Sequence, residues 1–290
     1  MQQAYAERAQ FFDCNGARLL GIVAAPATPR PVGVAIVVGG PQYRVGSHRQ
    51  FVQMARALAA AGFATIRFDY RGMGDAEGAP STFEAIDDDL RCAIDVLQRE
   101  AGTPHVVLLG LCDGASAALR YCAHDTRVCG IVAINPWVRS PNTEARTRLR
   151  FYYLKRVASV AFWRKVTRGA FAARESARDL ASAVATAART GRSDGPSFLA
   201  RMHDGWCAFG RPILTVLSGN DLTAREFEQW IDADPARRNA SRRRNVVIAR
   251  LNDADHTFSR ASDRTEAELA ITDWIDRVVV QTLPVANASR

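Results

Sequence analysis

Hydrophobic residues of this chain fall into short continuous runs that alternate with longer amphipathic stretches. The run VGVAIVVGG, residues 32–40, is followed by SHRQFVQMARALAAAG, residues 47–62. A continuous apolar run is typical of a strand buried on both faces. The second stretch has apolar residues at the 3.6-residue spacing of a helix, and we expect that helix to begin at Ser47 and to end at Gly62.

The same alternation continues to the end of the chain. A turn of Asn15 and Gly16 divides FFDCNGARLLGIVAAP into two strand-like halves, which predicts a β-hairpin. Strands that alternate with helices predict an α/β fold with a mostly parallel central sheet and helices on both faces. The remaining predicted strands are FATIRFDYRG, HVVLLGLC, VCGIVAINPWV, RPILTVLSGND and NVVIARLNDADH.

Residues 138–205 interrupt this alternation. We therefore predict a core domain of residues 1–137 and 206–290, with an inserted helical cap (lid) over residues 138–205. Between residues 139 and 205 there are fourteen Lys and Arg against five Asp and Glu. The net charge of this segment, 14 − 5 = +9, exceeds the net charge of +8 of the whole chain. The basic character therefore belongs to the cap, where we expect Arg148 and Tyr153 to contact a substrate.

Composition excludes several classes of protein. The first residues lack a basic start followed by an apolar run, so they do not predict a signal peptide, and no stretch has the roughly 18 apolar residues of a membrane span. The absence of both features predicts a cytoplasmic location. The six cysteines are scattered without a CxxC pair, which indicates reduced thiols and no zinc site, and we expect no cofactor. The confined positive charge is not the pattern of a nucleic-acid-binding protein.

Polar or glycine-rich residues follow the predicted strands. The segment Gly39–Gln42 follows one strand, Gly110–Gly114 with Cys112 at its centre follows another, and the last two strands end at Asp221 and His256. In open sheets of this kind, functional groups collect at the carboxyl ends of the strands. Cys112, Asp221 and His256 are thus a nucleophile, an acid and a histidine, in that order along the chain.

A division of catalytic roles follows from this order. Cys112 lies on a tight turn between a strand and a helix, where the helix N-terminus favours a thiolate. His256 would take the thiol proton and return it to a leaving group, and Asp221 would orient the imidazole. Asp253 and Asp255 are alternative acids, but they lie too near His256 in sequence to brace it well.

An oxyanion needs at least two hydrogen-bond donors. We expect one to be the backbone N–H of Asp113 and the second to come from Gly40 or Gln42, because Pro41 has no N–H. The carboxylate of Asp113 would disfavour a thiolate if it faced inward, and the sequence leaves its direction open. His48 begins a helix near this turn and is a further candidate for substrate binding.

The stretch DYRGMGDAEG lacks the Lys and Ser or Thr of a nucleotide loop and the spacing of a dinucleotide site. We therefore expect a structural turn here, braced by Asp69 and Arg71.

Five separated motifs together resemble the α/β-hydrolase superfamily: the initial hairpin, FDYRGMGDAEG, GLCDGAS, SGND and DADHTF. The segments VVGGPQYRVGSHRQF and GLCDGASAAL are similar, more narrowly, to the exosortase A system-associated hydrolases of type one. This resemblance implies an α/β-hydrolase fold, hydrolase chemistry and a link to exopolysaccharide and protein-sorting systems.

The predicted activity is the hydrolysis of an acyl ester or thioester through an acyl-cysteine intermediate. An acyltransferase with the same triad is the alternative, and a non-catalytic binding partner of a polysaccharide or sorting assembly is a third. The cap would attract an anionic substrate, such as a coenzyme A or phosphopantetheine thioester, or would rest on anionic lipid as a peripheral contact. It would otherwise pack on the core with its arginines solvated. Independently of the cap, the alternative for Cys112 is a buried thiol without a catalytic role.

Overall fold

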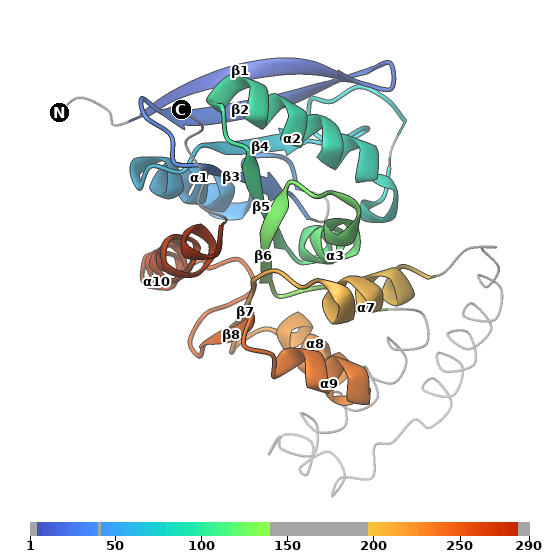
Figure 1. The fold of residues 1–290 in the computed structure, drawn as a ribbon. Helices are drawn as coiled ribbons and strands as arrows, with labels where there is room; N and C mark the ends of the chain where they lie inside the picture. The colour runs from blue at the N-terminus through green and yellow to red at the C-terminus, as the bar shows by residue number, and fades with distance from the viewer. Residues whose placement is uncertain (1–4, 40–41, 80, 140–196, 284–290) are drawn as a thin grey trace, which may run out of the picture. The chain divides into compact units, whose positions relative to one another are not determined.

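A computed structural model describes residues 5–39, 42–79, 81–139 and 197–283 (Figure 1). The chain divides into a unit of Met1–Trp137 with Ala200–Arg290 and a second unit of Val138–Leu199. Nearly all described residues belong to the first unit. Residues 140–196 of the predicted cap, Arg148 and Tyr153 among them, lie outside the described residues, as do Gly40 and Pro41 of the predicted oxyanion turn.

The described residues form one eight-stranded sheet in the order β1-β2-β4-β3-β5-β6-β7-β8. The first two strands form an antiparallel hairpin, β2 is antiparallel to β4, and all the other neighbours are parallel. The predicted mostly parallel α/β sheet is therefore confirmed. The strands are β1(Tyr5–Cys14), β2(Ala17–Pro26), β3(Val32–Val37), β4(Thr65–Asp69), β5(His105–Leu111), β6(Val128–Ile134), β7(Ile213–Ser218) and β8(Val246–Leu251).

Helices cover both faces of this sheet (Figure 1). Helices α1 and α10 lie on one face, and α2, α3 and α8 lie on the other. The helices are α1(Gln50–Ala60), α2(Asp87–Ala101), α3(Asp113–Tyr121), α7(Phe198–Ala208), α8(Leu222–Asp232), α9(Pro235–Ser241) and α10(Ala261–Trp274); the short helical turns are η1(Ser47–Arg49), η2(Phe83–Ala85), η3(Cys122–His124) and the π-helical η4(Ile275–Val280). Within the described residues, no helix combines the length and the apolar character that crossing a membrane requires.

The strand order reverses at β3. The next strand along the chain, β4, lies on one side of β3, while β5 lies on the other. Register aligns the carboxyl ends of the parallel strands: Val37 pairs with Gly110, Leu111 with Ile134, and Ser218 with Leu251. Loops that follow these strands therefore meet at one edge of the sheet, next to the reversal point, where ligands bind in folds of this kind.

The start of α1 differs from the sequence-based expectation. The helix begins at Gln50 and not at Ser47, and no side chain caps it. His48 and Arg49 both have left-handed backbone conformations, with φ of 53° and 62°. Such angles interrupt a helix, so Ser47 belongs to a separate turn, η1, and does not act as the N-cap that its residue type suggested.

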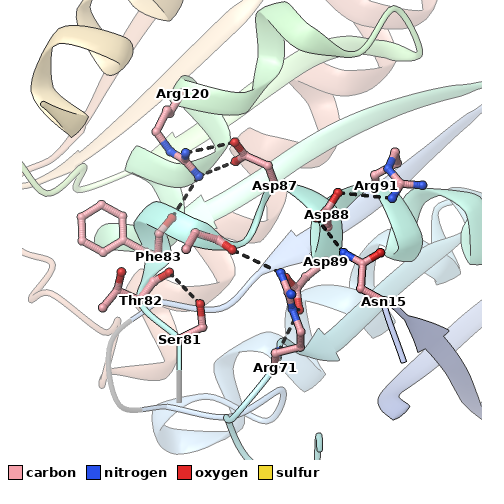
Figure 2. Close-up of polar contacts among 11 residues, drawn as sticks. Asn15, Arg71, Ser81, Thr82, Phe83, Asp87, Asp88, Asp89, Arg91 and Arg120 are labelled. Carbon is pink, nitrogen blue, oxygen red and sulfur yellow. Dashed lines mark hydrogen bonds and ion pairs between the residues drawn. The ribbon is translucent and has the colours of Figure 1, made fainter. Parts of the chain in front are cut away.

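Three consecutive aspartates at the start of α2 bind three different parts of the chain (Figure 2). Asp87 forms an ion pair with Arg120 of α3, whose side chain is almost fully buried. Asp88 accepts a hydrogen bond from the Asn15 side chain at 2.8 Å, and Asp89 accepts from Arg71, including a 2.8 Å bond from Nη2. Helix α2 therefore ties together α3, the β1–β2 turn and the loop after β4.

That loop is the structural turn expected from the sequence. Asp69, at the end of β4, accepts hydrogen bonds from the backbone N–H groups of Arg44 at 2.6 Å and Asp75 at 3.0 Å, and it pairs with the Arg44 guanidinium. Gly74 has φ of +52°, and a Cβ there would collide with the Asp69 carboxylate. Asp69 therefore fixes the loop after β4 and the segment after β3 in the same place.

Candidate active site

Cys112 occupies a strained turn between β5 and α3. Its φ of 59° and ψ of −123° lie outside the regions that non-glycine residues ordinarily adopt. The surrounding backbone holds this conformation: Cys112 N–H donates to the Ile134 carbonyl at 2.9 Å, and its own carbonyl accepts from Trp137 N–H at 3.1 Å and from Ser116 N–H at 3.2 Å. Strain maintained by so many contacts is typical of a functional position.

The flanking glycines are required by close packing. A Cβ on Gly110 would collide with the backbone of Gly114, and a Cβ on Gly114 would collide with the Val37 carbonyl oxygen at the end of β3. Helix α3 therefore begins directly against β3 and β5. Cys112 is half-buried at this elbow, with the N-terminus of α3 immediately behind it.

His256 and Asp221 come from the two neighbouring loops. The Asp221 carboxylate lies 2.7 Å from His256 Nδ1, so Nδ1 carries the proton that it donates to this acceptor. The other carboxylate oxygen of Asp221 accepts from Thr223 N–H at 3.0 Å and caps α8. Since Asp221 is bound on both oxygens, the imidazole direction is fixed, and Nε2 is left for the thiol.

The imidazole also forms a hydrogen bond with the Cys112 side chain. Burial lowers the pKa of His256, but the hydrogen bonds and charges of Asp221 and Cys112 outweigh it and raise this pKa from 6.5 to about 10. The structure thus brings together Cys112, His256 and Asp221, the three residues that the sequence placed at the strand ends. About a third of the His256 side chain is exposed, at 32%.

The alternative acids have other contacts. The Asp255 carboxylate accepts from the backbone N–H groups of Thr257 at 3.0 Å and Ser259 at 3.1 Å, which stabilises the turn after His256. The Asp253 backbone carbonyl accepts a 3.0 Å hydrogen bond from the Asn220 side chain. Both residues therefore hold the loop that carries His256, while Asp221 contacts the imidazole itself.

The oxyanion side of the site is described in part. Gly39 lies so close to Asp113 that a Cβ on Gly39 would collide with the Asp113 carboxylate. This carboxylate also contributes, after burial, to raising the pKa of Tyr70 to about 12. Asp113 therefore directs its side chain along the turn after β3. The Gln42 side chain accepts from Ser47 N–H at 3.2 Å, which fixes the far end of that turn.

His48 is exposed on the turn η1, and no described contact joins it to Cys112, His256 or Asp221. Arg148, Tyr153 and Gly40 lie outside the described residues. For the described part of the chain, no group of three or more His, Cys, Asp or Glu could hold a metal ion. The other cysteines are buried or half-buried thiols away from the strand-end site.

Sequence reasoning missed Asn135, directly after β6. Its side chain is fully buried, and it donates to the Ser218 hydroxyl at 2.9 Å and to the His256 carbonyl at 3.4 Å. The signal was present in the sequence, since an Asn-Pro pair ends a buried apolar run there. It was included in the predicted strand and was therefore not counted among the polar strand ends.

A family model for the alpha/beta hydrolase family matches residues 34–269. The chain therefore belongs to the alpha/beta hydrolase family, and the corresponding resemblance is confirmed. The match begins in β3 and includes the elbow, Asp221 and His256.

Individual relatives are more distant. The human protein ABHD12B is 30% identical over 112 residues, which span 36% of this chain and only 30% of that relative. The esterase Pf2001 of Pyrococcus furiosus has a similar structure, with a TM-score of 0.64, 16% identity and coverage of 96% of this chain and 93% of that one. Est1E of Butyrivibrio proteoclasticus, solved with ferulic acid bound, gives a TM-score of 0.61 and 14% identity, with coverage of 93% and 99%. These two structures share the fold.

Proposed function

We propose that this protein hydrolyses a carboxylic ester or thioester through an acyl-cysteine intermediate on Cys112. The observation that carries the proposal is that the His256 imidazole contacts both the Cys112 side chain and the Asp221 carboxylate. Cys112 itself lies at the elbow where α3 begins. Family membership supports hydrolase chemistry, and the similar fold of Pf2001, described as an esterase, favours an ester substrate.

The chemical steps use these groups in turn. Cys112 gives its thiol proton to His256 Nε2, and Sγ then bonds as the thiolate to the substrate carbonyl carbon while the carbonyl electron pair moves onto oxygen. The resulting oxyanion accepts from the Asp113 N–H and from the turn after β3. When the carbonyl re-forms, the bond to the leaving oxygen or sulfur breaks and His256 protonates that atom.

Water completes the cycle. His256 takes a proton from water as its oxygen attacks the acyl-cysteine carbonyl, the C–S bond then breaks, and the thiolate recovers its proton. Asp221 stays ionised throughout and stabilises the imidazolium. An acyl-cysteine is also a thioester that other nucleophiles attack, so an acyltransferase remains the alternative function.

The decisive experiment is intact-mass detection of the acyl-enzyme. Wild-type protein is incubated with activated short-chain esters and with acyl-coenzyme A donors, beside Cys112→Ala, Cys112→Ser and His256→Ala. Cys207→Ala is the matched control, because Cys207 is also half-buried and has a histidine neighbour, with 4.0 Å between Cys207 Sγ and His203 Nδ1, but lies within α7.

We expect one acyl adduct on the wild type and on Cys207→Ala, and none on Cys112→Ala. His256→Ala should acylate at least about a hundredfold more slowly, the usual effect of losing a general base. Cys112→Ser should lose activity, because a serine hydroxyl is a weaker acid and a weaker nucleophile than a cysteine thiol. An adduct that persists in Cys112→Ala would refute the proposed nucleophile, and turnover that rises only when an acceptor is added would identify a transferase.

The same panel of donors tests the expectation that the substrate is anionic or linked to coenzyme A. If anionic or coenzyme A-linked donors react faster than neutral ones, the basic segment outside the described residues contributes to substrate choice. A role in exopolysaccharide or exosortase systems, and a cytoplasmic location, stay predictions. Absence of any adduct or turnover across the donor panel would favour the non-catalytic binding role.

A further inference from the structure

Asn135 has an unusual backbone conformation and a fully buried side chain. Its φ of 44° is left-handed, in a segment whose next residue is Pro136. Asparagine tolerates this conformation better than most residues, but it carries a polar amide that must find partners when it is buried. The contacts of that amide therefore explain why an asparagine occupies this place in an otherwise apolar layer.

The amide joins three strand ends. Asn135 follows β6, and its Oδ1 accepts from Ser218 N–H at 2.8 Å while its Nδ2 donates to Ser218 Oγ at 2.9 Å. The same Nδ2 donates to the backbone carbonyl of His256 at 3.4 Å. Ser218 is the last residue of β7, directly before the loop that carries Asp221. One side chain thus contacts the beginning of the Asp221 loop and the backbone of His256.

The same short segment also holds the elbow. Trp137 N–H donates to the Cys112 carbonyl at 3.1 Å, and the Ser116 hydroxyl donates to the Trp137 carbonyl at 2.6 Å. Asn135 N–H in turn donates to the Val216 carbonyl of β7 at 3.0 Å. Residues 135–137 therefore connect the backbone of Cys112 to the backbone of His256.

We propose that Asn135 is a positioning residue, whose side-chain amide holds the His256 loop and the Asp221 loop at the distance from Cys112 that proton transfer requires. The inference rests on the proposed function. Asn135 does not touch the reacting atoms. It acts by fixing the backbone of His256, since a catalytic group displaced by about 1 Å loses on the order of a hundredfold in rate.

Two variants distinguish the effect of the Asn135 side-chain amide from the effect of its left-handed backbone conformation. Asn135→Gly keeps the left-handed conformation without strain and removes all the side-chain hydrogen bonds. Asn135→Asp keeps size and the bond from Ser218 N–H but has no donor for the His256 carbonyl. Asn15→Gly is the matched control, because Asn15 also has a positive φ, 54°, and donates one side-chain hydrogen bond, but lies in the exposed β1–β2 turn.

The first readout needs no substrate. Alkylation of Cys112 by iodoacetamide is followed by intact mass as a function of pH, with His256→Ala as the reference for a missing base. Among the described residues, the ionisable groups that contact the His256 imidazole are the Asp221 carboxylate and the Cys112 thiol, so the profile reports this set. We expect both Asn135 variants to move the profile from that of the wild type toward that of His256→Ala.

The second readout is turnover of an activated ester. We expect kcat to fall by about a hundredfold in Asn135→Gly and Asn135→Asp, with little change in KM, because substrate contacts are retained. Asn15→Gly should match the wild type in both readouts. Melting temperature and circular dichroism establish that each variant is folded.

Three results would overturn the inference. Folded Asn135 variants with the wild-type alkylation profile and kcat would show that the amide serves packing alone. An equal loss in Asn15→Gly would show a general effect of stability. If His256→Ala is alkylated like the wild type, His256 is not the base, and both the proposed function and the positioning role are refuted. If only the Asn135 variants behave like the wild type, the positioning role is refuted while the proposed function stands. Should Asn135→Gly and Asn135→Asp not fold, Ser218→Ala removes one partner of the amide and must give a smaller change in the same direction.

Discussion

Among the residues of the site, His256 is the one whose pKa changes most in the folded chain. Burial alone would favour the neutral imidazole, and the structure instead supplies a carboxylate and a thiol that favour the cation. The protonated imidazole is the form that a thiolate pairs with, and it is also the form that protonates a leaving group. The contacts of His256 with Asp221 and Cys112 therefore link this histidine to the stability of the folded chain.

A prediction about stability follows from the sign of this shift. The folded pKa of about 10 lies above the ordinary value of 6.5, so the folded state binds the proton more tightly than the unfolded state. The resulting stabilisation is complete below about pH 6.5 and is lost as the pH rises through about 10. We expect the difference in free energy of unfolding between wild type and His256→Gln to shrink over this interval, measured by urea denaturation.

Asp221→Asn provides the control, because it removes the strongest partner while the imidazole stays. Its free energy of unfolding should show a weaker dependence on pH than that of the wild type across the same interval. An identical pH dependence in wild type and His256→Gln would contradict the assignment of this proton to His256.

Individual residues also show what the sequence could predict. Cys112, Asp221 and His256 were found because each lies at the carboxyl end of a predicted strand, and parallel strands end at one edge. The direction of the Asp113 side chain was not predictable, because it depends on the backbone of Gly39, which comes from a different strand. Asn135 was missed because it was counted within a predicted strand, and its partners, Ser218 and the His256 carbonyl, are distant in sequence.

Helices show a comparable limit. The amphipathic spacing of α1 located the helix but not its first residue, because the left-handed turn at His48 and Arg49 overrides the capping preference of Ser47. Helix α3 begins at the elbow as expected, and its neighbours explain the two glycines around Cys112. Spacing thus predicts which residues face the core, while helix ends depend on what the adjoining loop contacts.

Packing of α7 against α3 leads to a prediction about two glycines. A Cβ on Gly205 would collide with the Leu119 carbonyl oxygen of α3, whereas Gly210 has no atom within 4 Å of the same position. We expect Gly205→Ala to lower the free energy of unfolding by about 1–3 kcal/mol or more, because backbone must move to relieve the overlap. Gly210→Ala is the matched control.

Gly210→Ala should leave the melting temperature unchanged or raise it slightly, since alanine restricts the unfolded chain more than glycine does. Each variant adds one methyl group to the wild type, so their melting temperatures can be compared directly. Equal stability of the two would mean that α7 does not approach α3 as closely as described.

The larger unit of the chain is organised around a sheet whose centre is buried on both faces. Every residue of β3 and β4 is buried, while β8 at one edge has two exposed and two half-buried residues among six. The alternation of apolar runs predicted this class of fold. It did not predict the strand order, because the order is set by which crossover packs on which face and not by any one segment.

Hydrogen exchange should follow this distribution of burial. We expect the amides of β3 and β5 to exchange the most slowly, at rates close to those of global unfolding, and those of β8 and β1 to exchange faster by local opening. Mass spectrometry of peptides that cover Val32–Val37, His105–Leu111 and Val246–Leu251 measures the difference. Faster exchange in β3 than in β8 would contradict the described sheet order.

The alignment of the strand ends also has a consequence for how the protein folds. The Asn135 amide reaches across 83 residues to Ser218 and across 121 residues to His256. Contacts between such distant parts of a chain form late and slowly, because a large loop must close before any of them is made. On the proposed function, the reactivity of Cys112 is therefore a marker of the completed topology: during refolding, its reaction with an alkylating agent should return with the last cooperative step, after most of the helical signal has already recovered.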